Sequence, residues 1–264
     1  MADSTADPWD LLVAPWHLDE HIPDFPVPAA ATVVARPALP DGPVPARMSV
    51  LHRAATDAVA RKTRPLVLSG DCSTARAVLA AQQQHHPDLA VLWFDAHGDF
   101  NTPAISTSGY LAGMALATLT GRTPDLFDDT LGLRPVPDTS IVLADARDLD
   151  PAEHDALTTS EVHRIPAEPA AVTSALERLG PVPVYLHLDI DVIDGAQVPG
   201  ARFPAGPGPS LAQIEECLAA ARATARLAAA CLACAWLPEH AADATSRQAI
   251  TRLTAALGAS LTWP

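Results

Sequence analysis

Two apolar runs, each followed directly by acidic residues, limit most strongly how this chain can fold. Residues 89–94 contain no turn residue, and Asp95, His97 and Asp99 come straight after them. Residues 182–188 form a second run, which Asp189 and Asp191 follow. Short apolar runs of this kind are typical of buried strands in a parallel sheet. Open α/β sheets bind ligands beyond the carboxyl ends of their strands, so we expect these polar side chains to meet at that edge.

The polar residues after each run are spaced by two. In an extended backbone such residues point to the same face, which predicts that their side chains converge. Burying several like charges together is unfavourable, and a bound cation would remove that penalty. A single Asp-x-Asp pair is often only an exposed turn, whereas two such groups after two buried runs favour a metal site.

The ligand types indicate which metal the site would bind. Carboxylates with one imidazole suit Mn²⁺, and suit Mg²⁺ or Zn²⁺ less well. Two neighbouring cations could share bridging carboxylates and one water molecule, whose pKa they would lower to supply a hydroxide nucleophile.

Candidate strands alternate with candidate helices along the whole chain. This order predicts an α/β fold with three layers, in which helices cover both faces of a central, mostly parallel sheet. Residues 108–119 are predicted to be helical, and residues 230–237 are predicted to form a late strand. The sequence shows no internal repeat or interdomain linker, so we expect one domain over residues 1–264.

Composition argues against several classes of partner. The 264 residues include 17 basic and 31 acidic side chains, a formal charge of −14, which disfavours nucleic acid and anionic membranes as partners. No apolar run approaches transmembrane length, and the acidic start at residues 1–8 lacks the pattern of a signal peptide. Four cysteines in a chain of this length do not indicate a disulfide scaffold. A cytoplasmic location is therefore expected.

Three segments resemble motifs of the arginase/agmatinase family of ureohydrolases. They are Ser-Gly-Asp-Cys-Ser at 69–73, Asp-Ala-His-Gly-Asp-Phe-Asn-Thr-Pro at 95–103 and Asp-Ile-Asp-Val-Ile-Asp at 189–194. They occur in the family's order, and the resemblance runs from about residue 11 to residue 238. It implies an arginase-like fold and hydrolysis of a guanidino group. It also implies two Mn²⁺ ions, held by Cys72, Asp95, His97, Asp99, Asp189 and Asp191.

The resemblance also implies roles in catalysis and substrate binding. Asp99 corresponds to the residue that takes the proton of the attacking hydroxide and passes it to the leaving amine. Asn101 and Ser108 match positions where arginases hold the α-carboxylate of an amino-acid substrate. Asp150 matches the residue that faces the α-amino group, and Glu153 lies a little beyond it. The expected partner is thus a small guanidino amino acid, while the choice between a monomer and a homo-oligomer stays open.

Three positions depart from the family pattern. Cys72 stands where the family has a histidine ligand, Ala112 where arginases have a proton-shuttling histidine, and Ala235 where the family has a glutamate that pairs with the guanidinium. Cys72 is either a thiolate ligand or a small apolar replacement that leaves one metal a ligand short. A thiolate would make the site more anionic, could weaken Mn²⁺ binding on that side and could admit Zn²⁺ or Fe²⁺.

These departures favour a less basic substrate than arginine. Burying a guanidinium without a carboxylate partner is costly, and N-hydroxylation makes a guanidine much less basic. One branch of the resembled family hydrolyses Nω-hydroxy-L-arginine to L-ornithine and hydroxyurea in specialised, antibiotic-producing metabolism. We expect this activity, with plain arginase activity and a non-catalytic guanidino-ligand-binding homologue as the alternatives. Trp16, His17 and His21, after the first strand, are also expected near the same edge, where they could help to close the pocket.

Overall fold

The computed structural model describes residues 8–127 and 130–264, so most of the acidic N-terminal segment considered above lies outside the described residues. The strands are β1 (Asp10–Ala14), β2 (Trp16–His17), β3 (Glu20–His21), β4 (Thr32–Val33), β5 (Pro65–Ser69), β6 (Ala90–Asp95), β7 (Ile141–Asp145), β8 (His163–Ile165), β9 (Val184–Asp189) and β10 (Leu227–Ala233). The α-helices are α1 (Val44–Val59), α2 (Ala75–Gln82), α3 (Ala115–Leu119), α4 (Pro151–Thr159), α5 (Pro169–Leu179), α6 (Leu211–Thr224) and α7 (Ala244–Ala256).

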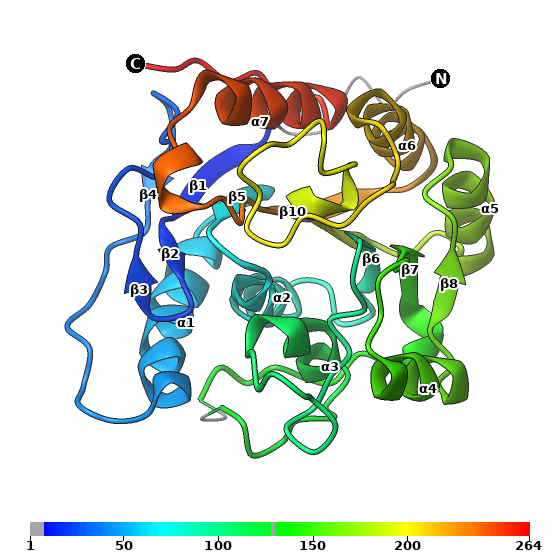
Figure 1. Ribbon diagram of the computed structural model, residues 1–264, viewed down its shortest axis with the longest axis horizontal. Coiled ribbons are helices and arrows are strands. Elements are labelled where there is room, and N and C mark those ends of the chain that lie inside the picture. Colours follow the sequence, from blue (N-terminus) through cyan, green and yellow to red (C-terminus); the bar gives the residue numbers. More distant parts are fainter. Residues whose placement is uncertain (1–7, 128–129) are drawn as a thin grey trace.

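The predicted three-layer α/β fold is confirmed. Within the described residues, eight strands form one sheet in the order β4-β1-β5-β10-β9-β6-β7-β8, and every neighbouring pair in it is parallel. In Figure 1 the sheet crosses the middle of the molecule, with α5, α6 and α7 on one side and α1 to α4 on the other. Strands β2 and β3 form a separate antiparallel hairpin beside the carboxyl end of β1.

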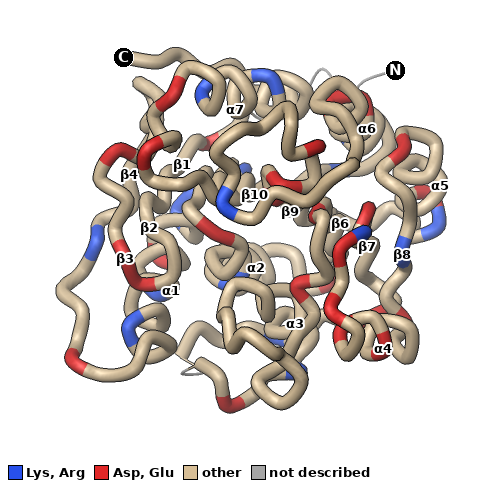
Figure 2. The backbone as a smooth tube through the Cα atoms, in the orientation of Figure 1, with Lys and Arg blue, Asp and Glu red and all other residues tan. Residues whose placement is uncertain are grey.

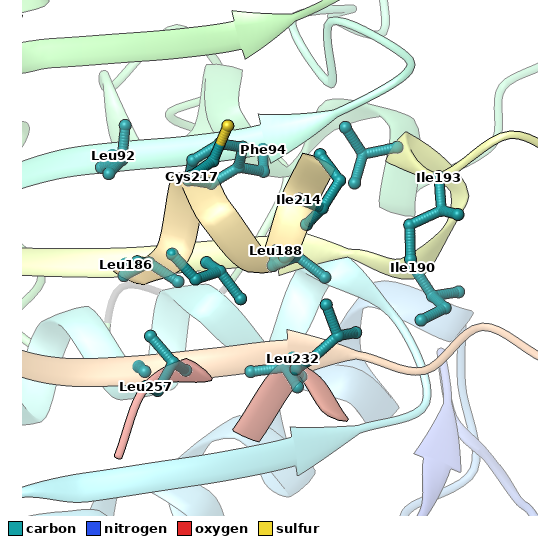
Figure 3. Close-up of a cluster of buried hydrophobic side chains, with 14 of the residues drawn as sticks. Leu92, Phe94, Leu186, Leu188, Ile190, Ile193, Ile214, Cys217, Leu232 and Leu257 are labelled. Carbon is teal, nitrogen blue, oxygen red and sulfur yellow. The ribbon is translucent and has the colours of Figure 1, made fainter. Parts of the chain in front are cut away.

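Alternation along the strands divides the core into two apolar layers. Leu92, Leu186 and Leu188 belong to the layer packed against α5, α6 and α7, together with Ile214 and Leu257 (Figure 3). Their neighbours in sequence, such as Val91, Trp93 and Tyr185, belong to the layer beneath the other helices. Successive side chains of a strand point to opposite faces, so both faces of these strands are buried. This explains why the sequence shows continuous apolar runs there.

The helix boundaries follow local chemistry. The hydroxyl of Ser210 accepts a hydrogen bond from the Gln213 amide at 3.1 Å and caps α6. Helix α5 has Pro169 in its first turn, where no amide donor is needed, and it ends at Gly180, whose φ of 78° favours glycine.

The prediction of a helix over residues 108–119 was wrong for its first half. The α-helix begins only at Ala115, after a short 3-10 turn over Ala112–Met114. Ser106 and Ser108 accept hydrogen bonds from the amides of Gly109 and Tyr110, at 3.0 and 3.2 Å. These side-chain bonds offer the backbone an alternative to the helix and keep the segment in a loop. The late strand predicted over 230–237 instead ends at Ala233.

Within the described residues, no helix combines the length and the apolar character needed to cross a membrane.

The two-layer core predicts a large loss of stability on truncating a central side chain. Leu186 is fully buried between strands β6 and β10, so Leu186→Ala should lower the free energy of unfolding by about 2–5 kcal/mol, measured by urea denaturation. The matched control is Val33→Ala in the edge strand β4, where the side chain is 47% exposed. It should change the same quantity by less than about 0.5 kcal/mol. Equal losses in both variants would contradict this account of the core.

Candidate active site

The order of the sheet brings the chemically important segments together. Strands β5, β10, β9 and β6 are consecutive neighbours and run parallel, so the segments that follow them meet at one edge. These segments carry Cys72, Ala235, the pair Asp189 and Asp191, and the group from Asp95 to Asp99. Figure 2 shows acidic positions gathered where β6, β7 and β9 end.

The turn after β5 presents Cys72 to this edge. Gly70 lies so close to the Trp16 carbonyl that any Cβ there would overlap it, so the position requires glycine. The carboxylate of Asp71 accepts a hydrogen bond from the Ser73 amide at 2.8 Å and starts a 3-10 turn over Cys72–Thr74. This turn aims the Cys72 side chain toward the end of β9.

The loop after β6 does not have the extended geometry that the spacing of two suggested. Strand β6 ends at Asp95, and Asp99 has a φ of 47°, in the left-handed region. Gly98 fits under Glu153, because a Cβ there would lie 2.7 Å from the Glu153 Cδ atom. Glu153 also accepts a hydrogen bond from the Phe100 amide at 2.8 Å and so holds the loop in place. The convergence therefore comes from a tightly folded loop.

The second acidic pair also leaves its strand at once. Asp189 is the last residue of β9, and its carboxylate accepts a hydrogen bond from the Asp191 amide at 3.0 Å. This bond starts a 3-10 turn over Ile190–Val192. The side chain of Arg147 donates to the carbonyl oxygens of Asp191 at 3.2 Å and Val192 at 3.0 Å, which fixes the turn from outside.

Two groups of candidate ligand atoms result, and they share Asp95. One consists of Cys72, Asp95 and Asp189, and the other of Asp95, His97 and Asp191, with the ligand atoms of each group within 4.8 Å of one another. The Cys72 sulfur lies 2.8 Å from Asp189 Oδ2. The Nδ1 atom of His97 lies 3.4 Å from Asp95 Oδ1 and 3.2 Å from Asp191 Oδ2. A residue common to both groups is what a bridging carboxylate between two cations requires.

The electrostatics of the site favour added positive charge. Burial, followed by the charges of Asp95 and neighbouring acids, raises the pKa values of Asp99 and Asp189 well above their usual range. Burial and Asp95 raise the pKa of Asp191 to about 7. Burial opposes protonation of His97, but its bonds to Asp191 and Asp95 raise its pKa to about 12. These buried acids therefore need protons or cations to offset their charge.

The free donor atoms fit a dinuclear metal site. Asp99 is 6% exposed, and its Oδ2 atom has no hydrogen-bond partner among the described residues. An unpaired buried carboxylate oxygen is costly unless something absent from the polypeptide satisfies it. Asp99 belongs to neither group of three, but the charges of Asp95 and Asp189 raise its pKa. The oxygen-rich donor set with one imidazole suits a hard divalent cation such as Mn²⁺.

A buried layer of aromatic side chains supports the shared aspartate. Trp93 Nε1 donates a hydrogen bond to Asp95 Oδ2 at 3.1 Å, and His187 stacks on Trp93 with ring centroids 3.6 Å apart. The Tyr185 hydroxyl lies 3.0 Å from His187 Nδ1. Burial lowers the pKa of His187 to about 3, so this imidazole is neutral and packs as part of the support.

A cavity of about 390 Å³ opens above the candidate ligands. Its lining includes nine of the ten site residues predicted from sequence, namely Cys72, His97, Asp99, Asn101, Ser108, Asp150, Glu153, Asp189 and Asp191. The tenth, Asp95, is 1% exposed and lies in the cluster beneath the cavity. The Asn101 side chain donates to Asp150 Oδ2 at 3.4 Å, so these two lie together on the wall.

Sequence reasoning missed some of the cavity lining. Tyr110, Asp71, Asp148 and Phe203 also line it. Ala112 and Ala235 also line the cavity. Each therefore presents only a methyl group at a position where the family pattern has a larger, polar side chain. The position of Tyr110 between Ser108 and Ala112 could have indicated that it lines the cavity. Nothing in the sequence indicated its contacts with His17 and Phe203.

Comparison with known proteins decides the family. A sequence model described as the arginase family matches residues 15–258. The chain belongs to the arginase family.

Named relatives within the arginase family include enzymes for two substrates. An N(omega)-hydroxy-L-arginine amidinohydrolase of Streptomyces lavendulae is 34% identical over 148 residues, which is 55% of this chain and 52% of the relative. An arginase of Staphylococcus aureus (strain COL) is 35% identical over 148 residues, 52% of this chain and 48% of the relative. The matched part thus spans about half the length of these curated relatives.

The arginase of Bacillus caldovelox shares the fold. Its native structure at pH 5.6 superposes with a TM-score of 0.79 at 22% identity, covering 96% of this chain and 98% of that one. This similarity extends the shared architecture well beyond the segment that matches in sequence.

The crowded carboxylates predict an unusual pH dependence when no metal is bound. Folding raises the pKa of Asp191 from 3.8 to about 7, so this group destabilises the metal-free protein increasingly as the pH rises across that window. With a chelator present, the unfolding free energy of the wild type should fall relative to that of Asp191→Asn as the pH rises from about 4 to about 7. The expected difference is on the order of 1 kcal/mol or more, measured by urea denaturation at each pH.

Saturating Mn²⁺ should reverse this trend in the wild type, because a cation favours the ionised carboxylate. Identical pH profiles for the two metal-free proteins would contradict the electrostatic account.

Proposed function

We propose that the chain is a manganese-dependent amidinohydrolase that converts Nω-hydroxy-L-arginine and water to L-ornithine and hydroxyurea. The observation that carries this proposal is the pair of ligand groups sharing Asp95 at the base of a cavity whose wall holds Asn101, Ser108, Asp150 and Glu153. The ligand groups suit two divalent cations, and the residues of the cavity wall suit the two charged groups of an α-amino acid.

Each part of the site has a chemical task in this proposal. Two bound Mn²⁺ ions would supply a hydroxide nucleophile from water at neutral pH. The ions would be held by Cys72, Asp95, His97, Asp99, Asp189 and Asp191. The Oδ2 atom of Asp99, which has no hydrogen-bond partner among the described residues, would accept a proton and return it to the departing nitrogen. The guanidino carbon then loses its bond to the ornithine nitrogen and gains the oxygen of water.

The substrate choice rests on the small side chains at two positions of the cavity lining. Ala112 and Ala235 face it with methyl groups, so neither position offers an acid or base to the guanidine. A cationic guanidinium would gain no carboxylate partner at position 235, whereas a hydroxyguanidine is less basic and can bind closer to neutral. The named amidinohydrolase relative acts on this substrate, which supports the same choice here.

An assay of two substrates tests the proposed reaction. With protein purified in Mn²⁺, ornithine release from Nω-hydroxy-L-arginine should show a kcat/KM at least about tenfold higher than release from L-arginine. Asp99→Asn should reduce kcat on the preferred substrate by about 10²–10⁴-fold.

Faster release from arginine would make the chain a plain arginase, the activity named for the Staphylococcus relative. No release from either compound at full metal loading would leave a guanidino-binding homologue without catalysis.

The metal content of variants tests Cys72 as a ligand. Burial and the charges of Asp189, Asp99 and Asp95 raise the pKa of the Cys72 thiol well above its usual range, so only a bound cation would favour the thiolate. Cys72→Ala should reduce the bound Mn²⁺ by about one ion per chain after gel filtration, because it removes one of the three donors of its group. Cys72→His should raise Mn²⁺ retention above that of wild type, because imidazole suits this metal better than sulfur.

The matched control for the metal measurement is Cys217→Ala in α6, a buried cysteine outside both ligand groups. It should keep the wild-type metal content. An unchanged metal content in both Cys72 variants would show that the sulfur is not a ligand.

A further inference from the structure

Tyr110 is fixed on two sides at the cavity wall. Its ring stacks on His17, with centroids 5.8 Å apart and an interplanar angle of 22°. It also contacts Phe203, with centroids 4.9 Å apart at 52°. The phenol oxygen lies 3.1 Å from His17 Nε2. Three contacts from two distant parts of the chain therefore hold one side chain in a single orientation.

The direction of the hydrogen bond to His17 follows from its second partner. His17 Nδ1 lies 3.2 Å from the carbonyl oxygen of Gly70, which can only accept. Nδ1 therefore carries the proton, and the Asp71 carboxylate 3.9 Å away favours that arrangement. In the neutral imidazole Nε2 is then an acceptor, so the Tyr110 hydroxyl donates to it. This leaves the lone pairs of the phenol oxygen free to accept a hydrogen bond.

Tyr110 remains a neutral phenol in this environment. Burial, with the nearby charges of Asp71, Cys72, Asp189 and Asp99, raises its pKa far above the usual value. Tyr110 lines the same cavity as Cys72, Asp99 and Asp189. It shares the cavity lining with Ala112 and Ala235, whose small side chains leave room beside it. Tyr110 thus adds a neutral acceptor to the cavity wall.

We propose that Tyr110 is a substrate-binding residue whose phenol oxygen accepts a hydrogen bond from an N–H of the guanidine group, with His17 as the residue that positions it. This inference rests on the proposed function, because it concerns the same cavity. A neutral acceptor leaves a buried guanidinium cation without a charge partner, which is costly, whereas a weakly basic hydroxyguanidine can bind closer to neutral and avoids this cost. Tyr110 thereby contributes to substrate choice.

Ligands with and without the guanidine separate this role from simple packing. Binding is measured on Mn²⁺-loaded protein with all candidate metal ligands intact, from KM for Nω-hydroxy-L-arginine where ornithine is released and by calorimetry where it is not, and by calorimetry for L-norvaline. Tyr110→Phe keeps the ring and its contacts but removes the hydroxyl. Affinity for Nω-hydroxy-L-arginine should fall about five- to tenfold, the usual effect of one neutral hydrogen bond. Affinity for L-norvaline, which has the same α-amino acid end but no terminal nitrogen, should change less than about twofold.

The positioning role of His17 has its own readout. His17→Ala should reproduce the loss for Nω-hydroxy-L-arginine, and Tyr110→Phe added to it should cause no further loss, because the two residues act as one unit. His21→Ala, at an exposed position of the same hairpin, is the matched control and should bind both ligands as the wild type does.

The inference is overturned if Tyr110→Phe weakens both ligands equally or changes neither. It is also overturned if the wild-type protein binds no guanidino amino acid. If the wild type binds Nω-hydroxy-L-arginine without releasing ornithine, the proposed hydrolysis fails, while the comparison of the two ligands still decides the role of Tyr110.

Discussion

Mutual repulsion among buried carboxylates is the constraint on which the rest of this structure depends. Asp95, Asp99, Asp189 and Asp191 are each 6% exposed or less and lie at one edge of the sheet. Such groups cannot all ionise together without a compensating charge, and the raised pKa values of three of them express this. His97 offsets part of the charge from one side, whereas Cys72 adds none of the positive charge that the cluster needs. The strands that lead into this cluster are buried on both faces.

The order of the strands in the sheet brings these groups together. Strand β10 comes last in the sequence yet lies between β5 and β9, so the core must assemble from distant segments before the cluster exists. Trp93 extends this support to the shared aspartate, because its ring is locked against His187 in the apolar layer and its Nε1 holds one carboxylate oxygen. The position of the candidate ligands therefore depends on packing far below them.

Much of the fold, and the meeting of the candidate ligand residues at one edge of the sheet, could be predicted from the sequence, because both depend on short-range patterns. Apolar runs such as residues 182–188 indicate buried strands, and acidic residues directly after them indicate the ligand edge. The geometry expected from spacing was wrong in detail, since the backbone turns immediately after Asp95 and Asp189. The start of α3 was also wrong, because two serine hydroxyls compete for the backbone amides. The pairing of Tyr110 with His17 spans 93 residues, and no periodicity encodes such a contact.

The β2–β3 hairpin has a consequence for how this protein could diverge. It contributes no ligand atom to either group, yet the Leu18 amide and the His17 ring bind the turn that carries Cys72, through Asp71 and Gly70. A mutation in the hairpin can thus alter the cavity wall while the sheet and its acidic cluster remain intact. Because the same turn holds Cys72, a mutation in the hairpin would reach the cavity wall and one candidate ligand together, so substrate preference and metal binding would be coupled through this short segment.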